Sequence, residues 1–202
     1  MFRKILVVVS FTSLSIALAA CNGSSESQTP TRGEWIDYTY INEYLGLELL
    51  LPLGWFPTHG VGSGSPHGTE EEIPADAFED DGTFREMTAV GVERGYTAGD
   101  IVIRFSRLPD SAADKSEAEV LEEWAASLTV PAEGYVELNS GTTTIGNYEW
   151  YSISGFYLFE NDAELEIRAF ASIQGQYVRM IIVYVNSNST ITMDELLEWC
   201  FN

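Results

Sequence analysis

The chain has 202 residues, and its 10 basic side chains are outnumbered by 31 acidic ones, which gives a formal charge of −21. A surface this acidic repels phosphate groups, so nucleic acid and anionic lipid headgroups are excluded as partners. A basic ligand, a cationic peptide or a divalent cation stays compatible with the charge. The length suits one domain with a hydrophobic core of its own.

Residues 1–20 are predicted to be a signal peptide. Arg3 and Lys4 precede an apolar run, Ile5–Ala20, that only hydroxyl side chains interrupt. A transmembrane helix needs about 20 apolar residues, and this run is shorter. Removal of residues 1–20 also removes Arg3 and Lys4, which leaves 8 basic residues against 31 acidic ones and a formal charge of −23.

The sequence Leu18-Ala19-Ala20-Cys21 resembles the lipobox of bacterial lipoproteins. The resemblance implies that Cys21 receives a diacylglyceryl group carrying fatty acids such as palmitate and becomes the mature N-terminus. Two or three acyl chains hold a protein stably on a bilayer. We therefore expect a lipid anchor at Cys21 and a location on the extracytoplasmic face of a bacterial cell membrane. The alternative is an ordinary secretory signal followed by a coincidental cysteine.

The segment after Cys21 is polar and lacks aliphatic side chains, so we predict a flexible tether over residues 21–33 and a single domain over residues 34–202. Once Cys21 is acylated, Cys200 has no partner for an intramolecular disulfide. The stretch Phe56–Asp81 is rich in Gly, Pro, Ser and acidic residues without any period, which predicts a long loop.

Most of the domain is predicted to be strand, from alternating apolar residues bounded by turn signals. Strands are predicted over 38–42, 46–55, 85–93, 100–108, 135–139, 142–145, 148–159, 163–173 and 176–186. In the last of these, residues 180–185 are apolar on both faces. This strand is therefore expected at the centre of a sheet that is covered on both sides.

Two helices are predicted from capping boxes that precede helical periodicity. The first begins after Ser116, with Glu119 three residues later, and ends before Pro131. The second begins after Thr192 and carries Cys200 on its apolar stripe. A thiol in that position is expected to be a buried, inert side chain.

The stretch Tyr38–Trp55, "YTYINEYLGLELLLPLGW", resembles the start of the PsbP-like domains, which include domains of bacterial lipoproteins. One mid-chain helix, consecutive antiparallel strands and a C-terminal helix are similar as well. The resemblance implies an α+β fold, an α/β/α sandwich with a central antiparallel sheet and helices packed on its faces. It implies little about function, since relatives serve as photosystem subunits, partners of a small nuclear-transport GTPase and lipoproteins of unknown role.

The sequence contains no convincing catalytic set, and we predict no catalytic residue, no cofactor and no metal site. His59 and His67 stand in the long loop with Glu70, and imidazoles with a carboxylate are zinc ligands. Zinc ligands need a rigid frame, however, so these histidines are expected to be solvated. An oxygen cage formed by Asp76, Glu79 and Asp81 is the alternative for calcium.

The neighbouring aromatic residues Trp55 and Phe56, at the start of the long loop, are the candidate ligand-binding residues. The function expected is a non-enzymatic binding or accessory module whose partner is an envelope protein, a peptide or a glycan. One alternative is an envelope hydrolase or metal-dependent protein that uses the loop over residues 59–81. Another is a structural subunit of an envelope complex.

Overall fold

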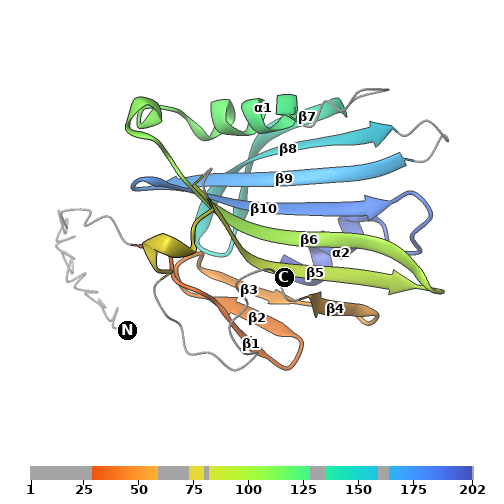
Figure 1. Ribbon diagram of the computed structural model, residues 1–202. Coiled ribbons are helices and arrows are strands. Elements are labelled where there is room, and N and C mark those ends of the chain that lie inside the picture. The colour runs from red at the N-terminus through yellow and green to blue at the C-terminus, as the bar shows by residue number, and fades with distance from the viewer. Residues whose placement is uncertain (1–28, 59–72, 80–81, 128–134, 159–163, 202) are drawn as a thin grey trace, which may run out of the picture.

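The computed structural model describes residues 29–58, 73–79, 82–127, 135–158 and 164–201. Its strands form a seven-stranded sheet in the order β4-β5-β6-β10-β9-β8-β7 and a three-stranded sheet in the order β1-β2-β3 (Figure 1). The strands are β1 (Glu34–Ile36), β2 (Thr39–Asn42), β3 (Leu47–Leu50), β4 (Trp55–Thr58), β5 (Thr83–Glu93), β6 (Tyr96–Arg107), β7 (Tyr135–Ile145), β8 (Tyr148–Leu158), β9 (Glu164–Gln174) and β10 (Tyr177–Asn186). The helices are α1 (Glu117–Ser127) and α2 (Met193–Phe201), with short 3-10 turns at Ala75–Ala77 and Asp110–Ala112.

Helix α1 covers one face of the seven-stranded sheet, above β8 and β9. Its start is closed by the predicted capping box. The Ser116 backbone N–H donates to Glu119 Oε2 over 2.8 Å, and the Glu119 backbone N–H donates to Ser116 Oγ over 3.3 Å. Leu121 and Ala125 then pack into a buried cluster with apolar side chains of β8, β9 and β10.

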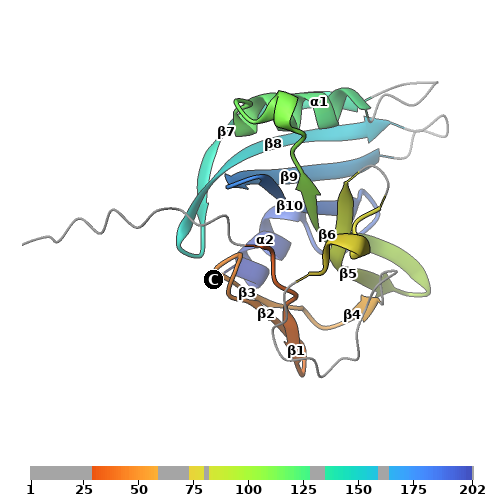
Figure 2. The ribbon, with the colours of Figure 1, turned by 60° about the vertical axis from the view of Figure 1, so that its left-hand side comes forward.

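The opposite face of the seven-stranded sheet is covered by helix α2 together with the three-stranded sheet (Figure 2). Met193, Leu196 and Cys200 of α2 are buried in one cluster with Ile181 and Val183 of β10. The inner face of the three-stranded sheet contributes to the same cluster through Tyr40, Leu47 and Leu49. The two sheets therefore share a continuous core.

Strand β10 lies at the centre of the seven-stranded sheet, between β6 and β9, as its apolar sequence predicts. Neighbouring side chains along it pack on opposite faces, with Ile181 in the core below α2 and Ile182 in the core below α1. The predicted α+β class and central antiparallel sheet are confirmed. The prediction did not include the three-stranded sheet as a second occupant of the face that α2 covers.

The predicted strand over residues 46–55 is shorter in the structure. Strand β3 ends at Leu50, and the Trp55 backbone N–H donates to the Pro52 carbonyl over 3.0 Å in the turn that follows. Trp55 begins β4, which pairs with β5, although Phe56 to Thr58 belong to the predicted loop. The pairing with a strand about thirty residues away is not visible in the local sequence, because residues 55–58 show no alternation of their own.

Two further boundaries differ from the prediction. Strands β5 and β6 extend to a two-residue turn in which Arg94 (φ 50°) and Gly95 (φ 83°) are both left-handed, so the predicted connection over residues 94–99 is mostly strand. Strand β7 continues through Gly141, where the sequence predicts a break, because its pairing with β8 holds on both sides of that residue.

The end of the predicted tether is part of the folded domain. Pro30 accepts a hydrogen bond of 2.8 Å from the Ile73 backbone N–H, and Thr31 accepts one of 3.0 Å from the Asn42 side chain. The guanidinium of Arg32 lies 5.4 Å from the centre of the Phe84 ring. The prediction that the tether reaches residue 33 is therefore wrong at its C-terminal end, because the main-chain carbonyls of Pro30 and Thr31 and the side chain of Arg32 find partners on the domain. Neither of the two described helices is long and apolar enough to cross a bilayer.

Candidate binding surface on helix α2

Helix α2 presents its outer face to solvent at the end of the chain. The Thr192 backbone N–H and hydroxyl donate to Glu195 Oε2 over 2.9 and 2.8 Å, and the Glu195 backbone N–H donates to Thr192 Oγ1 over 3.3 Å. This capping box fixes where the helix begins. Because Leu196 and Cys200 are buried, the helical period places Glu195, Glu198 and Trp199 on the outside.

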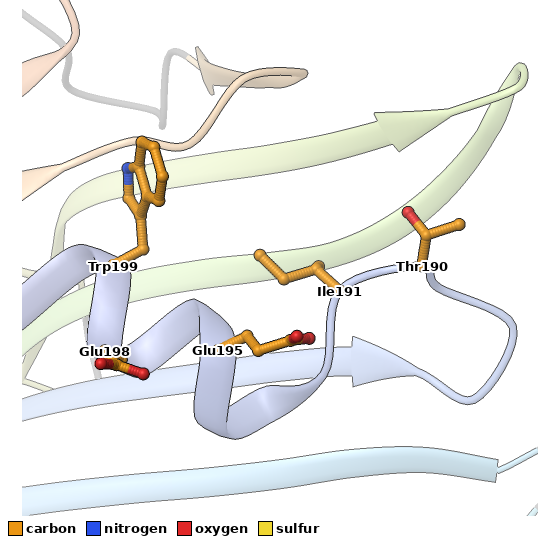
Figure 3. A pocket seen from close by; sticks show the side chains of 5 residues that line it. All are labelled: Thr190, Ile191, Glu195, Glu198 and Trp199. Carbon is orange, nitrogen blue, oxygen red and sulfur yellow. The ribbon is translucent and has the colours of Figure 1, made fainter.

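A hollow of about 590 Å³ lies beside this outer face, and we call it the Trp199 hollow. It is lined by Thr190, Ile191, Glu195, Glu198 and Trp199. Figure 3 shows Trp199 and Glu195 extending from neighbouring turns of α2, with the Ile191 side chain directed toward the space between them. The Trp199 side chain is 53 % exposed, which is unusual for the largest apolar side chain and marks it as a candidate contact residue.

The rim of the Trp199 hollow is held by Glu93 of strand β5. Its carboxylate accepts a hydrogen bond of 2.7 Å from the Thr190 backbone N–H and one of 3.1 Å from the Ser189 hydroxyl. The bond from the Thr190 backbone lowers the pKa of Glu93 more than any other contact does. The Ile191 backbone N–H donates in turn to Ser189 Oγ over 3.2 Å. The loop from β10 to α2 is thus fixed to β5 at Ser189 and Thr190.

The charged groups of the α2 surface are mainly acidic. Asp194 and Glu195 lie in the first turn, Glu198 follows, and the last turn contains no basic residue. The backbone hydrogen bond from Thr192 lowers the pKa of Glu195, followed by the bond from the Thr192 hydroxyl. Glu195 is therefore negatively charged at neutral pH.

A second depression, of about 540 Å³, lies on the other side of α2, and we call it the β7–β9 groove. Its lining consists of Asn139, Ser140, Gly141, Thr143, Thr144, Ile145, Ser152, Ile153, Ser154, Arg168, Phe170, Leu197, Glu198 and Phe201. Six of these fourteen residues carry a hydroxyl or amide side chain. Arg168 donates to Asp194 over 2.9 Å and lies 3.5 Å from Glu166, so its charge is balanced within the protein. Glu198 lines both depressions and separates them.

Arg179 is a buried charged residue that the sequence analysis did not single out. It lies in strand β10 at 2 % exposure, and burial lowers the pKa of its guanidinium. It donates to the Tyr44 carbonyl, Gln174 Oε1 and Ser172 Oγ over 3.1, 2.7 and 2.7 Å. The only local signal is one basic residue within an apolar strand. Because Tyr44 belongs to the turn between β2 and β3, Arg179 joins the two sheets and is a structural residue.

Aromatic rings surround the Arg179 guanidinium and complete its environment. The ring centres of Tyr148, Trp150 and Tyr44 lie 4.4, 5.2 and 5.8 Å from it. These rings compensate part of the cost of burying the charge through cation–π contacts. Within the described part of the chain, no carboxylate forms an ion pair with Arg179.

The structure separates the two predicted binding residues. The Trp55 side chain is 2 % exposed and packs inside the core, where it covers Gly91 of β5 and Gly99 of β6. A Cβ atom on Gly91 would overlap the indole, so the two glycines make room for the ring. Trp55 is therefore a core residue and not part of a surface platform. Phe56 is 48 % exposed, and ligand binding there stays a prediction.

Of the two cysteines, the structure describes Cys200 but not Cys21. Cys200 is 2 % exposed and reduced, and burial raises the pKa of its thiol from 9.0 to about 12. This agrees with the predicted inert thiol, because the thiolate is the reactive form. Cys21 and the signal peptide lie outside the described residues, as do His59, His67 and Glu70. Within the described ranges, no three His, Cys, Asp or Glu side chains are arranged to hold a metal ion.

Comparison with known proteins finds matches among solved structures only. No family model matches the chain, and no curated protein matches it. Among solved structures, LpqN of Mycobacterium tuberculosis, which is involved in cell envelope biogenesis, has 14 % identity and a TM-score of 0.47 over 76 % of this chain and 78 % of its own. The cyanobacterial PsbP (CyanoP) of Synechocystis sp. PCC 6803 has 13 % identity and a TM-score of 0.47 over 85 % of this chain and 88 % of its own.

Matches at this level do not assign a family. The resemblance of residues 38–55 to the PsbP-like domains therefore stays a resemblance.

Proposed function

We propose that the mature chain is a bacterial lipoprotein, anchored through Cys21 on the extracytoplasmic face of the membrane, whose domain is a non-enzymatic binding or accessory module. The partner class is an envelope protein, and the α2 surface is the contact site. The observation that carries the proposal is the double use of α2. Its inner face, with Leu196 and Cys200, belongs to the core, while its outer face exposes Trp199 beside the Trp199 hollow.

The position of the first packed residues supports the anchoring part of the proposal. Pro30 is already hydrogen-bonded to the domain, so only residues 22–29 separate it from Cys21. Eight residues span at most roughly 30 Å when fully extended. A lipid on Cys21 thus holds the domain within a few nanometres of the bilayer. An acidic surface suits that position, because it is repelled by anionic headgroups and does not adhere to them.

Cell fractionation tests the anchor. The chain without substitutions is expected in the membrane fraction and released only by detergent, whereas Cys21→Ala is expected in the soluble extracytoplasmic fraction. Cys200→Ala is the matched control, because it removes the other thiol and leaves the lipobox intact. If Cys21→Ala stays with the membranes, the anchor proposal is wrong.

The same cells test the binding role. A photo-crosslinking amino acid in place of Trp199 is expected to capture one envelope protein in intact cells. The same amino acid in place of Tyr96, which is 79 % exposed at the start of β6, is the control and is expected to capture none. Equal products from both positions, or none from position 199, would contradict a binding role for the α2 surface.

A further inference from the structure

The Trp199 hollow combines two kinds of wall. The Trp199 ring and the Ile191 side chain provide apolar surface, and the carboxylates of Glu195 and Glu198 provide negative charge. Glu195 and Trp199 are spaced i and i+4, so one helix face presents both. A ligand that matches both walls has an apolar stem and a positively charged end, as lysine and arginine side chains do.

One carboxylate of the hollow is held in place before any ligand arrives. Both capping bonds from Thr192 go to Glu195 Oε2. In the described part of the chain no hydrogen bond is made to the other oxygen, Oε1. A carboxylate that is already ordered loses little conformational entropy when it accepts a bond from a cation. The indole of Trp199 adds a π face, and among aromatic rings it attracts cations most strongly.

Charge selects the partner at longer range. The outer face of α2 carries acidic side chains without a basic residue in its last turn, and the whole chain has a formal charge of −21. Such a field increases the encounter rate of positively charged partners and decreases that of anionic ones. Arg168, on the β7–β9 side, bonds to Asp194 over 2.9 Å and compensates that carboxylate. The attraction is therefore centred on the Trp199 side of the helix.

We propose that the Trp199 hollow binds a lysine or arginine side chain from a basic segment of a partner protein, with the cation between the Trp199 ring and the Glu195 carboxylate. This inference rests on the proposed function, because it specifies the chemistry of the partner at the same surface. The β7–β9 groove, with hydroxyl and amide groups on Asn139 and Ser152, offers hydrogen bonds to the continuing backbone of that segment.

Calorimetric titration of the full lipidated chain in phosphatidylcholine nanodiscs tests this inference. The probe is tetralysine with both ends blocked, and blocked tetraglutamine is the neutral reference. Tetralysine is expected to bind and tetraglutamine is not. Trp199→Ala and Glu195→Gln are each expected to weaken tetralysine binding about two- to five-fold, the range of exposed cation–π contacts and ion pairs. Glutamine is accepted at the third position of a capping box, so Glu195→Gln preserves the helix start.

Matched variants separate a specific site from diffuse attraction. Glu122→Gln on α1 removes the same charge from another exposed position, and Tyr96→Ala removes another exposed aromatic ring. Both are expected to bind tetralysine like the unmodified chain. An equal loss in Glu122→Gln and Glu195→Gln overturns the inference in favour of net charge alone. Absence of tetralysine binding overturns the inference too. It is also overturned if the chain self-associates and Trp199→Ala abolishes that self-association, because the hollow would then bind a second copy of the chain.

The two proposals fail in different ways. If tetralysine does not bind while position 199 still crosslinks to an envelope protein, the partner chemistry is wrong and the binding role holds. If neither occurs, the α2 surface is not a binding site.

Discussion

Alkaline pH is expected to weaken the folded protein through the buried thiol of Cys200. Burial raises the pKa of this thiol from 9.0 to about 12, and the side chain is 2 % exposed. In the unfolded chain the thiol loses its proton as the pH rises above 9, whereas the folded chain keeps it. A group whose pKa is higher in the folded state supports folding fully below its unfolded pKa. That contribution is then lost as the pH rises from 9 toward 12.

The size of the effect follows from the two pKa values. In the unfolded chain at pH 11 the thiolate outnumbers the neutral thiol about a hundredfold, whereas in the folded chain the thiol is mostly neutral. This difference lowers the free energy of unfolding by about 3 kcal/mol. Tyr44, whose pKa burial raises from 10.0 to about 12, is a second contributor. By the same reasoning it accounts for about 1 kcal/mol at pH 11. Cys200 is thus expected to dominate the loss.

Urea unfolding at pH 8, 9, 10 and 11, under reducing conditions, measures this effect. Cys200→Ala is expected to be less stable at pH 8, because it loses buried contacts, but to lose about 3 kcal/mol less than the unmodified chain between pH 8 and 11. Cys21→Ala is the control and is expected to keep the unmodified slope. Parallel curves for Cys200→Ala and the unmodified chain would show that the thiol ionises in the folded state, and would refute the reasoning.

Two predictions concern packing and capping. Gly99→Ala places a methyl group against the Tyr184 carbonyl of β10 and the Trp55 ring, so its free energy of unfolding is expected to fall by about 3 kcal/mol in thermal melts. Gly141→Ala, whose Cβ has nothing within 4 Å, is the control, and equal melting temperatures for the two variants would contradict the packing described here. Thr192→Ala removes the cap of α2 and is expected to cost about 1 kcal/mol in urea unfolding. An unchanged midpoint would mean that α2 begins without help from that hydroxyl.

The elements that the sequence predicts well are those specified by local chemistry. The capping boxes at Ser116 and Thr192 are present in the structure, because the side chains involved are only three residues apart. The central position of β10 follows from apolar residues on both faces. In contrast, strand β4 forms only by pairing with β5, and residues 30–33 fold onto the domain through contacts with Asn42, Ile73 and Phe84. No local pattern marks those contacts.

In the candidate site too, some features follow from the local sequence and others only from contacts between distant segments. Sequence periodicity alone places Trp199 on the outer face of a C-terminal helix and Cys200 on its inner face, since the helical period does not depend on the rest of the fold. Whether an aromatic ring is covered depends on which distant residues meet it. Trp55, next to a predicted loop, is buried against Gly91 and Gly99. Trp199 is instead exposed beside a hollow, and Glu93 of β5 binds the loop at the rim of that hollow. The sequence by itself thus determined the helices and the central strand, and it predicts the anchor at Cys21. The tertiary structure decided which aromatic residue is available to a partner, because burial is set by contacts between segments far apart in the chain.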